Sequence, residues 1–528
     1  MAQNINKDIF SIKKEASEIL SEITSASFSL EKIEAGANRL GEFGERALPF
    51  VARHLRKEKS DEAVSRLLYL IELLNDSSYT AILKDALGSG QFRESSLKTR
   101  VEIIATLKSY ETTPFHSSEC FPGEDRETAF ITWAGRVLED FQSREYRAIS
   151  LLEEILLRET ENGKLIRSIA EALGEAAIPL LLILAGTDDR EASATAIKCL
   201  GRIKTDASVM ALKELSAISW DKEIAAEAGK AIRRLSFSGY DTGRVNFSPI
   251  DTLPEGSKLY ASPIDGLGNI NLCIAINKGS GRIETTFLLL NDETGIIDAF
   301  GSSNMKDREL SDMLAETSKE TSIKEVEPDY FFSLLNNALY LNKRYDLPLS
   351  PEFHYRKQAF NQYLRSKTFS PDFTCLPTDK IKADKSLIDL GGELFRKKEF
   401  EGWIISTPIS FDFAEKLSLL EAGGKQLQSI KKNKLLKDFC VEIITPIKKQ
   451  LAARLLMMAD FYLRNESDEE TTNIILATAL NLEQCDSCAL EDLPFLKVMA
   501  EKSMRNCIEA LEEGFDLREF EYDLDELD

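Results

Sequence analysis

Apolar residues recur at helical spacing through roughly the first 235 residues, and one helix-pair pattern returns along this stretch. In residues 170–185 a helix ends at Gly174 and an apolar helix opens behind Pro179. Residues 194–215 repeat this ending and add the next partner helix, and residues 225–235 carry a third copy. Self-similarity at a period of roughly 25 to 45 residues is typical of stacked helix pairs, so the pattern predicts an α-solenoid.

The same pattern stands near the N-terminus, where residues 37–49 read Ala-x-x-Leu-Gly-x-x-Gly-x-x-Ala-Leu-Pro and are echoed by residues 172–179. Small residues let paired helices approach, Gly ends the first helix in a left-handed cap, and Pro starts the second helix at its first turn. The pattern resembles HEAT repeats, in particular the short phycobilisome-lyase-like kind. This resemblance covers roughly residues 30–235 and implies a HEAT-like solenoid, but its motifs carry no catalytic residues.

After residue 235 the composition shifts to Gly, Ser and Pro, and alternating β-rich runs follow. Turn signals at residues 278–282 and 292–295 separate the later runs and predict a small antiparallel meander. The predicted strands are residues 258–262, 269–277, 283–291 and 296–300.

Helical spacing resumes after the meander and continues through most of the remaining chain. Residues 369–389 are interpreted as a loop, and residues 403–413 as one or two strands or a buried irregular segment. Residues 451–463 and 472–480 predict a helical hairpin, and residues 494–511 predict a third helix of that bundle. The further helices are expected at residues 307–321, 330–341 and 351–363.

The predicted fold class is mainly α, with an N-terminal α-solenoid of HEAT-like helix pairs, an α+β domain built on the meander, and a C-terminal helical bundle. The expected boundaries are 1–240 for the solenoid, 241–430 for the α+β domain, 431–510 for the helical domain and 511–528 for an acidic tail. This order resembles the organisation of certain bacterial proteins and implies no activity.

The chain has 88 acidic and 66 basic residues among 528, a formal net charge of −22. This charge disfavours binding to nucleic-acid phosphates and to anionic membranes, so we expect neither partner. No run approaches about 18 consecutive apolar residues, and the N-terminal residues lack the pattern of a secretion signal. We therefore expect a cytoplasmic protein.

Eight cysteines are spread along the chain, and the three histidines, His54, His116 and His354, stand in different regions. The cysteine density does not suggest a disulfide scaffold, and so few histidines leave little for histidine-based catalysis or a multi-histidine metal site. We expect no catalytic, cofactor-binding or metal-binding residues and no cofactor.

Cys485 and Cys488 have the spacing of a redox or zinc pair. Zinc requires four ligands, however, and the pair has neither a second Cys-x-x-Cys nor a nearby histidine. Because it follows a predicted helix, we interpret it as a helix-end pair without a special role. His116 and Cys120 share a predicted loop over residues 111–125 and form only a weak signal for a metal site or a nucleophile.

Residues 279–281 read Gly-Ser-Gly between Lys278 and Arg282, a combination that can offer backbone N–H groups and positive charge to a phosphate. A phosphate loop normally delivers its ligand to a helix N-terminus, whereas this stretch joins two predicted strands. Residues 422–425, Ala-Gly-Gly-Lys, lack the remaining positions of a Walker A motif. We interpret both stretches as turns.

Asp265, Asp292 and Asp298 fall near the ends of predicted strands, where carboxylates can converge for Mg²⁺ binding or acid–base work. The first two stand in a context that turns also require. They define an alternative function: a small-ligand-binding or metal-binding sensor, or a hydrolase-type enzyme, with its site in residues 258–300.

Residues 431–437, Lys-Lys-Asn-Lys-Leu-Leu-Lys, form a basic cluster that we interpret as a solvated helix face. From Glu509 to Asp528 ten acidic residues stand against Arg518 alone, with apolar residues between them. Such alternation is typical of a segment that folds on a basic or apolar groove of a partner. A solubilising tail, or a helix end packed on its own domain, suits the composition equally well.

The expected function is that of a non-catalytic protein–protein interaction scaffold or adaptor. A solenoid suits this role because stacking exposes an extended face without a pocket. Trp133, Trp220 and exposed helix residues are candidate anchors for an unidentified protein partner, and the acidic tail is a candidate contact segment.

Overall fold

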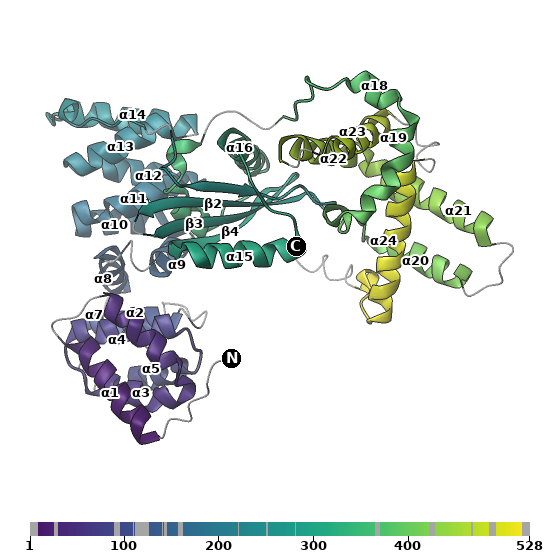
Figure 1. The fold of residues 1–528 in the computed structure, drawn as a ribbon. Coiled ribbons are helices and arrows are strands. Elements are labelled where there is room, and N and C mark those ends of the chain that lie inside the picture. The colour runs from purple at the N-terminus through teal and green to yellow at the C-terminus, as the bar shows by residue number, and fades with distance from the viewer. Residues whose placement is uncertain are drawn as a thin grey trace. The chain divides into compact units, whose positions relative to one another are not determined.

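The computed structural model describes residues 9–25, 30–88, 96–108, 110, 126–139, 141, 145–156, 162–219, 221–249, 252–279, 281–364, 370–421, 428–465, 468–484 and 493–519 (Figure 1). The chain divides into two compact units, Met1–Phe247 (unit 1) and Ser248–Asp528 (unit 2). The described residues are mainly helical with a small antiparallel sheet, which confirms the predicted mainly α class.

Unit 1 consists of helices joined by short connections. They are α1 (Ile9–Thr24), α2 (Leu30–Gly41), η1 (Gly44–Ala47), α3 (Leu48–Lys57), α4 (Asp61–Leu74), α5 (Tyr79–Gly88), α7 (Leu97–Lys108), α8 (Arg126–Glu139), α9 (Glu145–Leu156), α10 (Asn162–Leu173), η2 (Gly174–Ala177), α11 (Ile178–Ala185), α12 (Arg190–Leu200), α13 (Asp206–Ile218), α14 (Lys222–Phe237) and η3 (Thr242–Arg244).

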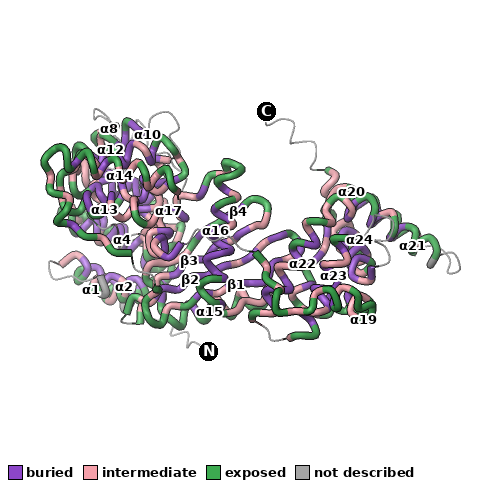
Figure 2. The backbone as a smooth tube through the Cα atoms, turned by 90° about the horizontal axis from the view of Figure 1, so that it is seen from above, coloured by how far each residue is buried: buried purple, intermediate pink, exposed green. Residues whose placement is uncertain are grey.

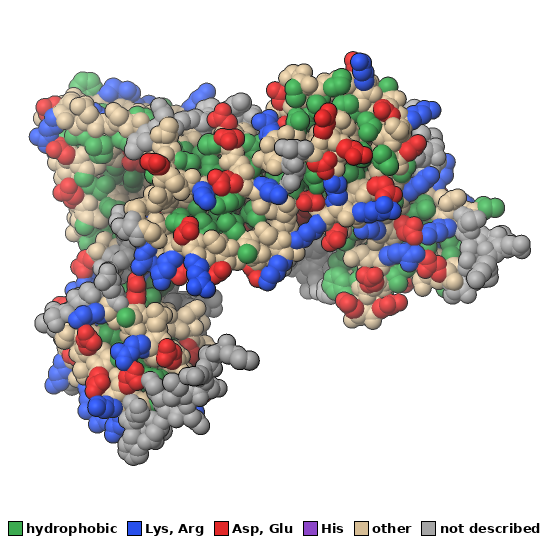
Figure 3. All heavy atoms as spheres, viewed as in Figure 1, with side chains coloured by type: hydrophobic (Ala, Val, Ile, Leu, Met, Phe, Trp, Pro, Cys, Tyr) green, Lys and Arg blue, Asp and Glu red, His purple; other side chains and the backbone are tan. Residues whose placement is uncertain are grey.

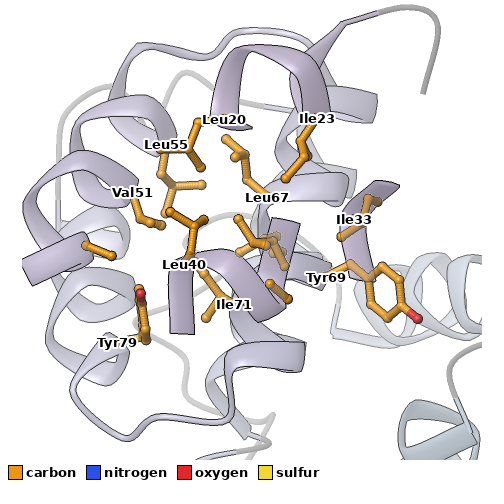
Figure 4. Packing of buried hydrophobic residues seen from close by; sticks show 14 of the residues in the cluster. Leu20, Ile23, Ile33, Leu40, Val51, Leu55, Leu67, Tyr69, Ile71 and Tyr79 are labelled. Carbon is orange, nitrogen blue, oxygen red and sulfur yellow. The ribbon is translucent and has the colours of Figure 1, made fainter. Parts of the chain in front are cut away.

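The apolar stripes of the first helices meet in one core. Leu20 from α1, Leu40 from α2, Val51 from α3 and Leu67 from α4 point inward toward one another and are buried (Figure 4). Burial of each such side chain contributes about 1.5–3 kcal/mol, so this core accounts for much of the stability of the first helices.

Two copies of the repeated sequence pattern adopt the same local structure. Gly44 and Gly174 have positive φ angles of 54° and 55°, each opens a 3₁₀ turn, and Pro stands in the first turn of the next helix. The predicted left-handed glycine is thus confirmed, although in the first copy it is Gly44 and not Gly41. The ending at Gly201, in residues 194–215, differs because Gly201 has a φ of −68°. A Cβ on Gly201 would lie 3.3 Å from that of Ala231, so this glycine allows α12 and α14 to approach closely.

The later helices of unit 1 pack in a regular order. Helix α12 contacts α10, α11 and α14, and α13 contacts both α11 and α14. The α10–α11 stretch, Gly163–Ala185, is the one described stretch long and apolar enough to cross a membrane by length and composition. Half of its apolar window is buried, and Gly174 interrupts it with a left-handed residue. The stretch is therefore weak evidence for a membrane span.

Unit 2 opens with an antiparallel sheet. Its strands are β1 (Lys258–Ala261), β2 (Asn269–Gly279), β3 (Arg282–Asn291), β4 (Gly295–Lys306) and β5 (Lys324–Glu325), in the order β4-β3-β2-β1-β5. Cys273 pairs with Tyr260 on one side and with Phe287 on the other. The predicted meander is confirmed, although β4 runs six residues beyond its predicted end and β5 was not predicted.

Helices cover both faces of this sheet (Figure 1). Helix α15 (Asp307–Glu320) packs through Leu310 on Cys273, Ala275 and Phe287, and α16 (Pro328–Tyr345) contacts β1, β3 and β4. Alternate strand residues therefore point to opposite apolar layers, and β2 is buried on both faces along most of its length (Figure 2).

A second group of helices completes unit 2. They are α17 (Pro351–Lys357), η4 (Asn361–Tyr363), α18 (Thr378–Ala383), α19 (Lys385–Asp389), η5 (Leu390–Arg396), η6 (Lys398–Phe400), α20 (Pro408–Glu421), α21 (Gln428–Phe439), the π-helical turn η7 (Cys440–Ile444), α22 (Thr445–Asn465), α23 (Glu469–Gln484), α24 (Pro494–Glu512) and η9 (Leu517–Glu519).

The predicted hairpin is present, because α22 packs along α23. The interpretation of residues 369–389 as a loop is wrong in its second half, where α18 and α19 form. Both are short helices held by contacts with α23, and contacts distant in sequence are invisible to local periodicity. Of residues 403–413, residues 403–407 are irregular with Trp403 buried, as the second alternative predicts, whereas residues 408–413 form the start of α20, so no strand forms there.

Candidate functional site

The three aspartates of the predicted sheet-end site have separate roles. Asp265 lies in its own turn, where its Oδ1 accepts hydrogen bonds from the backbone N–H groups of Leu267 (2.9 Å) and Asn269 (2.8 Å). Asp298 is exposed on β4 and accepts a hydrogen bond from the N–H of Ala299. Only Asp292 is engaged by a distant side chain, so the three carboxylates do not share one site.

The partner of Asp292 is Arg454 on α22. Nε and Nη2 of Arg454 each donate a 2.8 Å hydrogen bond to one carboxylate oxygen of Asp292, and Nη1 donates to the carbonyl oxygen of Gly266 at 2.7 Å. The two side chains are 6% and 13% exposed. A bidentate pair of this kind is strong and fixes its geometry. Asp292 is therefore neutralised by the guanidinium and is not free to act as a base or a metal ligand.

The backbone is shaped around this pair. Gly268 has a φ of +90°, and a Cβ at this position would lie 2.0 Å from Oδ1 of Asp292. A Cβ on Gly266 would lie 2.6 Å from Cα of Trp403. The backbone of the Asp-Gly-Leu-Gly turn thus lies against the Asp292–Arg454 ion pair and against the irregular segment that begins at Trp403. Gly266 and Gly268 are therefore explained by close packing and not by ligand binding.

The predicted phosphate-type turn connects β2 and β3. Gly279 and Gly281 have φ angles of +79° and +71°, which suit a tight hairpin. Lys278 forms an ion pair with Glu284 (2.6 Å), and Arg282 donates to the carbonyl of Asn304 (3.4 Å). Both cations are used within the sheet, and a strand follows the turn, in agreement with its interpretation as a turn.

Several candidates lie outside the described residues. They are His116, Cys120, Trp220, Cys485, Cys488, Ser280 and residues 422–425. Trp133 is described and is 1% exposed, so its ring belongs to the core of unit 1 and is not a surface anchor. Among the described residues no group of three or more His, Cys, Asp or Glu side chains is placed to hold a metal ion.

A buried ionic network in unit 1 was not predicted. Glu72 on α4 accepts hydrogen bonds through Oε1 from Thr106 Oγ1 (2.7 Å) and from Nε (3.0 Å) and Nη2 of Arg147 on α9. Arg136 on α8 donates to Glu102 on α7 at 2.7 Å, and Nη1 of Arg147 lies 3.9 Å from the same carboxylate. The network joins four helices through charged side chains, three of which are only 3% exposed.

Burial raises the pKa of the Glu102 carboxyl, but the charges of Arg147 and Arg136 act against it, and the net pKa lies below the ordinary value of 4.5. The two buried carboxylates face two guanidinium groups, and Arg136 also pairs with the exposed Glu139. Its signal in the sequence is a single glutamate inside each of two apolar helical runs, at Glu72 and Glu102. That pattern indicates a buried carboxylate but does not show which arginine pairs with it.

Exposed cations gather on the side of unit 1 where α10, α12 and α14 pack together. Arg167 on α10, Lys198 on α12, Arg202 directly after α12 and Arg234 on α14 are all exposed. Within the described residues none of the four forms an ion pair with a carboxylate. We call these four residues the basic ridge.

Electrostatic effects show that members of the basic ridge are neighbours. Burial raises the pKa of the Cys199 thiol, and the charges of Arg202 and Arg167 oppose this rise, while Glu171 adds to it. A hydrogen bond from Lys230 lowers the pKa of the Glu227 carboxyl, and Arg234 and Lys198 lower it further. The ridge therefore spans three helices and keeps a positive excess over its two nearby glutamates.

No family model, curated protein or solved structure matches the chain. The class of protein that the described residues define is a mainly helical chain with a small antiparallel sheet. Function must therefore be inferred from the arrangement of its own residues.

Proposed function

We propose that the protein is a non-catalytic interaction scaffold, and that the α10–α14 region is a HEAT-like solenoid whose basic ridge binds an acidic surface of another protein. The order of helix contacts supports this proposal. Helices α10, α12 and α14 neighbour one another as one layer, and α11 and α13 form the second layer. Alternating layers of this kind are what stacked helix pairs produce.

The observation that carries the proposal is the basic ridge. A chain of net charge −22 that leaves four neighbouring cations exposed, with no ion pair to a described carboxylate, has the charge pattern of a binding face. Complementary charge mainly sets the rate and the specificity of association, because exposed pairs each add little affinity. Apolar contacts from the same helices are needed to supply the rest of the binding free energy.

The test is affinity capture from an extract of the cells that make the protein, with the partner quantified by mass spectrometry. The ridge variant is R167E/K198E/R202E/R234E. The matched control, R46E/R53E/K57E/K59E, reverses four exposed cations of unit 1 that lie outside the ridge. Circular dichroism verifies that both variants keep their helix content.

We expect one stoichiometric protein to be retained by the unaltered chain and by the control and to be lost from the ridge variant. The proposal would be contradicted if the same protein were captured by the unaltered chain, the control and the ridge variant alike. It would also be contradicted if none of the three captured a protein at low salt. If the captured protein disappears after nuclease treatment of the extract, the ridge binds nucleic acid and the scaffold assignment is wrong.

A further inference from the structure

The α20–α21 hairpin of unit 2 exposes apolar and basic side chains together. Leu419 and Ile430, at the loop ends of α20 and α21, are 76% and 74% exposed. Lys431 and Lys434 are exposed beside them on α21 and have no carboxylate partner among the described residues. We call these four residues the hairpin face. Figure 2 shows α21 as largely exposed, and in Figure 3 Lys and Arg side chains gather over α21 and α24.

Leu419 and Ile430 flank the same loop and have lysines without an ion pair beside Ile430, the combination of apolar surface and polar rim that is typical of an interaction site. Unlike Lys431 and Lys434, the neighbouring Lys432 is already paired, because it forms an ion pair with Glu501 on α24 at 2.6 Å. The hairpin is therefore fixed to the bundle on one side and uncovered on the other.

The end of the described chain lies directly on this hairpin. Leu517 in η9 packs with Phe411 and Ala414 of α20. Arg518 forms ion pairs with Asp412 and with Glu415 of α20, both at 2.8 Å. Glu415 stands one helical turn before Leu419, so the described chain ends against α20, the helix that carries Leu419 of the hairpin face.

We propose that residues 520–528 dock on the hairpin face. Their sequence, Phe-Glu-Tyr-Asp-Leu-Asp-Glu-Leu-Asp, has five carboxylates, four apolar residues and no cation. This composition complements two unpaired lysines and two exposed aliphatic side chains. Nine extended residues span about 30 Å, whereas Glu415 to the end of α20 covers about 9 Å, so the segment is long enough.

Tethering favours this occupant over other acidic ligands. A segment joined to the bundle by η9 has a millimolar effective concentration at the hairpin, so even weak contacts suffice for binding. An anionic membrane is disfavoured because the carboxylates of the segment and the net charge of −22 repel it.

The experiment compares the full chain with a chain that ends at Glu519, by hydrogen exchange of residues 417–421 and 430–436. We expect these amides to exchange about threefold to tenfold faster after truncation, as protection by a weakly bound segment requires. A synthetic peptide of residues 520–528 should restore the protection and should bind the truncated chain in a salt-dependent manner.

Two variants of the truncated chain locate the peptide. K431E/K434E should bind the peptide roughly tenfold more weakly, because each exposed ion pair contributes a factor of about two to five. K380E/K385E, which reverses two exposed lysines on α18 and α19, should bind it nearly as the unaltered truncated chain does. The proposal would be overturned if the amides exchanged at equal rates in the full and truncated chains. It would also be overturned if K431E/K434E and K380E/K385E lost peptide affinity to the same extent. Cross-links from the segment to the hairpin of a second copy only would also overturn it.

Discussion

Each unit buries an arginine that pairs with a carboxylate from a part of the chain distant in sequence. The two pairs differ in how completely their hydrogen-bonding atoms find partners. In unit 2 Arg454 uses Nε, Nη1 and Nη2, and both oxygens of Asp292 accept a hydrogen bond. In unit 1 Glu72 receives all its described hydrogen bonds at Oε1, and its buried Oε2 has no partner among the described residues. Removing one partner of a closed pair leaves the other partner buried without its hydrogen bonds, whereas the open network already contains one buried oxygen without a described partner.

The largest expected effect is that of Arg454→Met. Removal of the guanidinium leaves Asp292 charged and buried, so the free energy of unfolding of unit 2 should fall by about 3–5 kcal/mol. The change is measured by unfolding in urea, with hydrogen exchange of the β3 amides as the readout. Arg308→Met is the matched control, because Arg308 is 92% exposed, and it should cost less than about 0.5 kcal/mol. The double variant R454M/D292L should recover part of the loss, and equal effects of R454M and R308M would refute the importance of the pair.

A smaller effect is expected for Glu72→Gln in unit 1. The amide keeps an acceptor for Thr106 but removes the charge that faces Arg147, so the free energy of unfolding should fall by about 1–3 kcal/mol. Thermal unfolding of unit 1, with exposed Glu153→Gln as the control, measures the change. A loss as large as that of Arg454→Met would contradict the description of the network as open, because it would require a further partner at Oε2, such as an ordered water.

The acid response of unit 1 should depend on Glu102. Its pKa in the folded state lies below the ordinary value of 4.5, so its contribution to stability is complete above about pH 4.5 and is lost as the pH falls through the folded pKa. Unfolding free energies measured from pH 6 to pH 3 should therefore decline more steeply for the unaltered chain than for Glu102→Gln. Parallel curves would contradict the assignment of this carboxylate.

The comparison also shows what the sequence can predict. The left-handed Gly174 with Pro179, and the strands around the turns at 278–282 and 292–295, follow from local rules, and the structure contains them. Arg454 and Asp292 stand 162 residues apart, and no local pattern selects one arginine for one aspartate. The sequence groups Asp292 with Asp265 and Asp298 as one candidate site, whereas in the structure each has its own partners, because a turn sequence does not reveal which side chain is buried behind it.

The smallest effect is expected at Asp468, a half-exposed carboxylate that caps a helix and also pairs with one lysine. Asp468 caps α23 by accepting hydrogen bonds from the N–H (3.0 Å) and the hydroxyl (2.6 Å) of Thr471, and it pairs with Lys397 (2.9 Å). These contacts lower its pKa to about 2 from 3.8, so the contribution of the cap is present above about pH 4 and disappears as the pH falls toward 2. Asp468→Ala should lower the free energy of unfolding of unit 2 by about 1 kcal/mol at neutral pH. At pH 2 the variant and the unaltered chain should become nearly equal in stability, whereas the loss from Arg454→Met should not follow the same pH dependence. If Asp468→Ala lowers the free energy of unfolding as much as Arg454→Met does at neutral pH, the deeper burial of Asp292 does not explain a larger contribution of its ion pair.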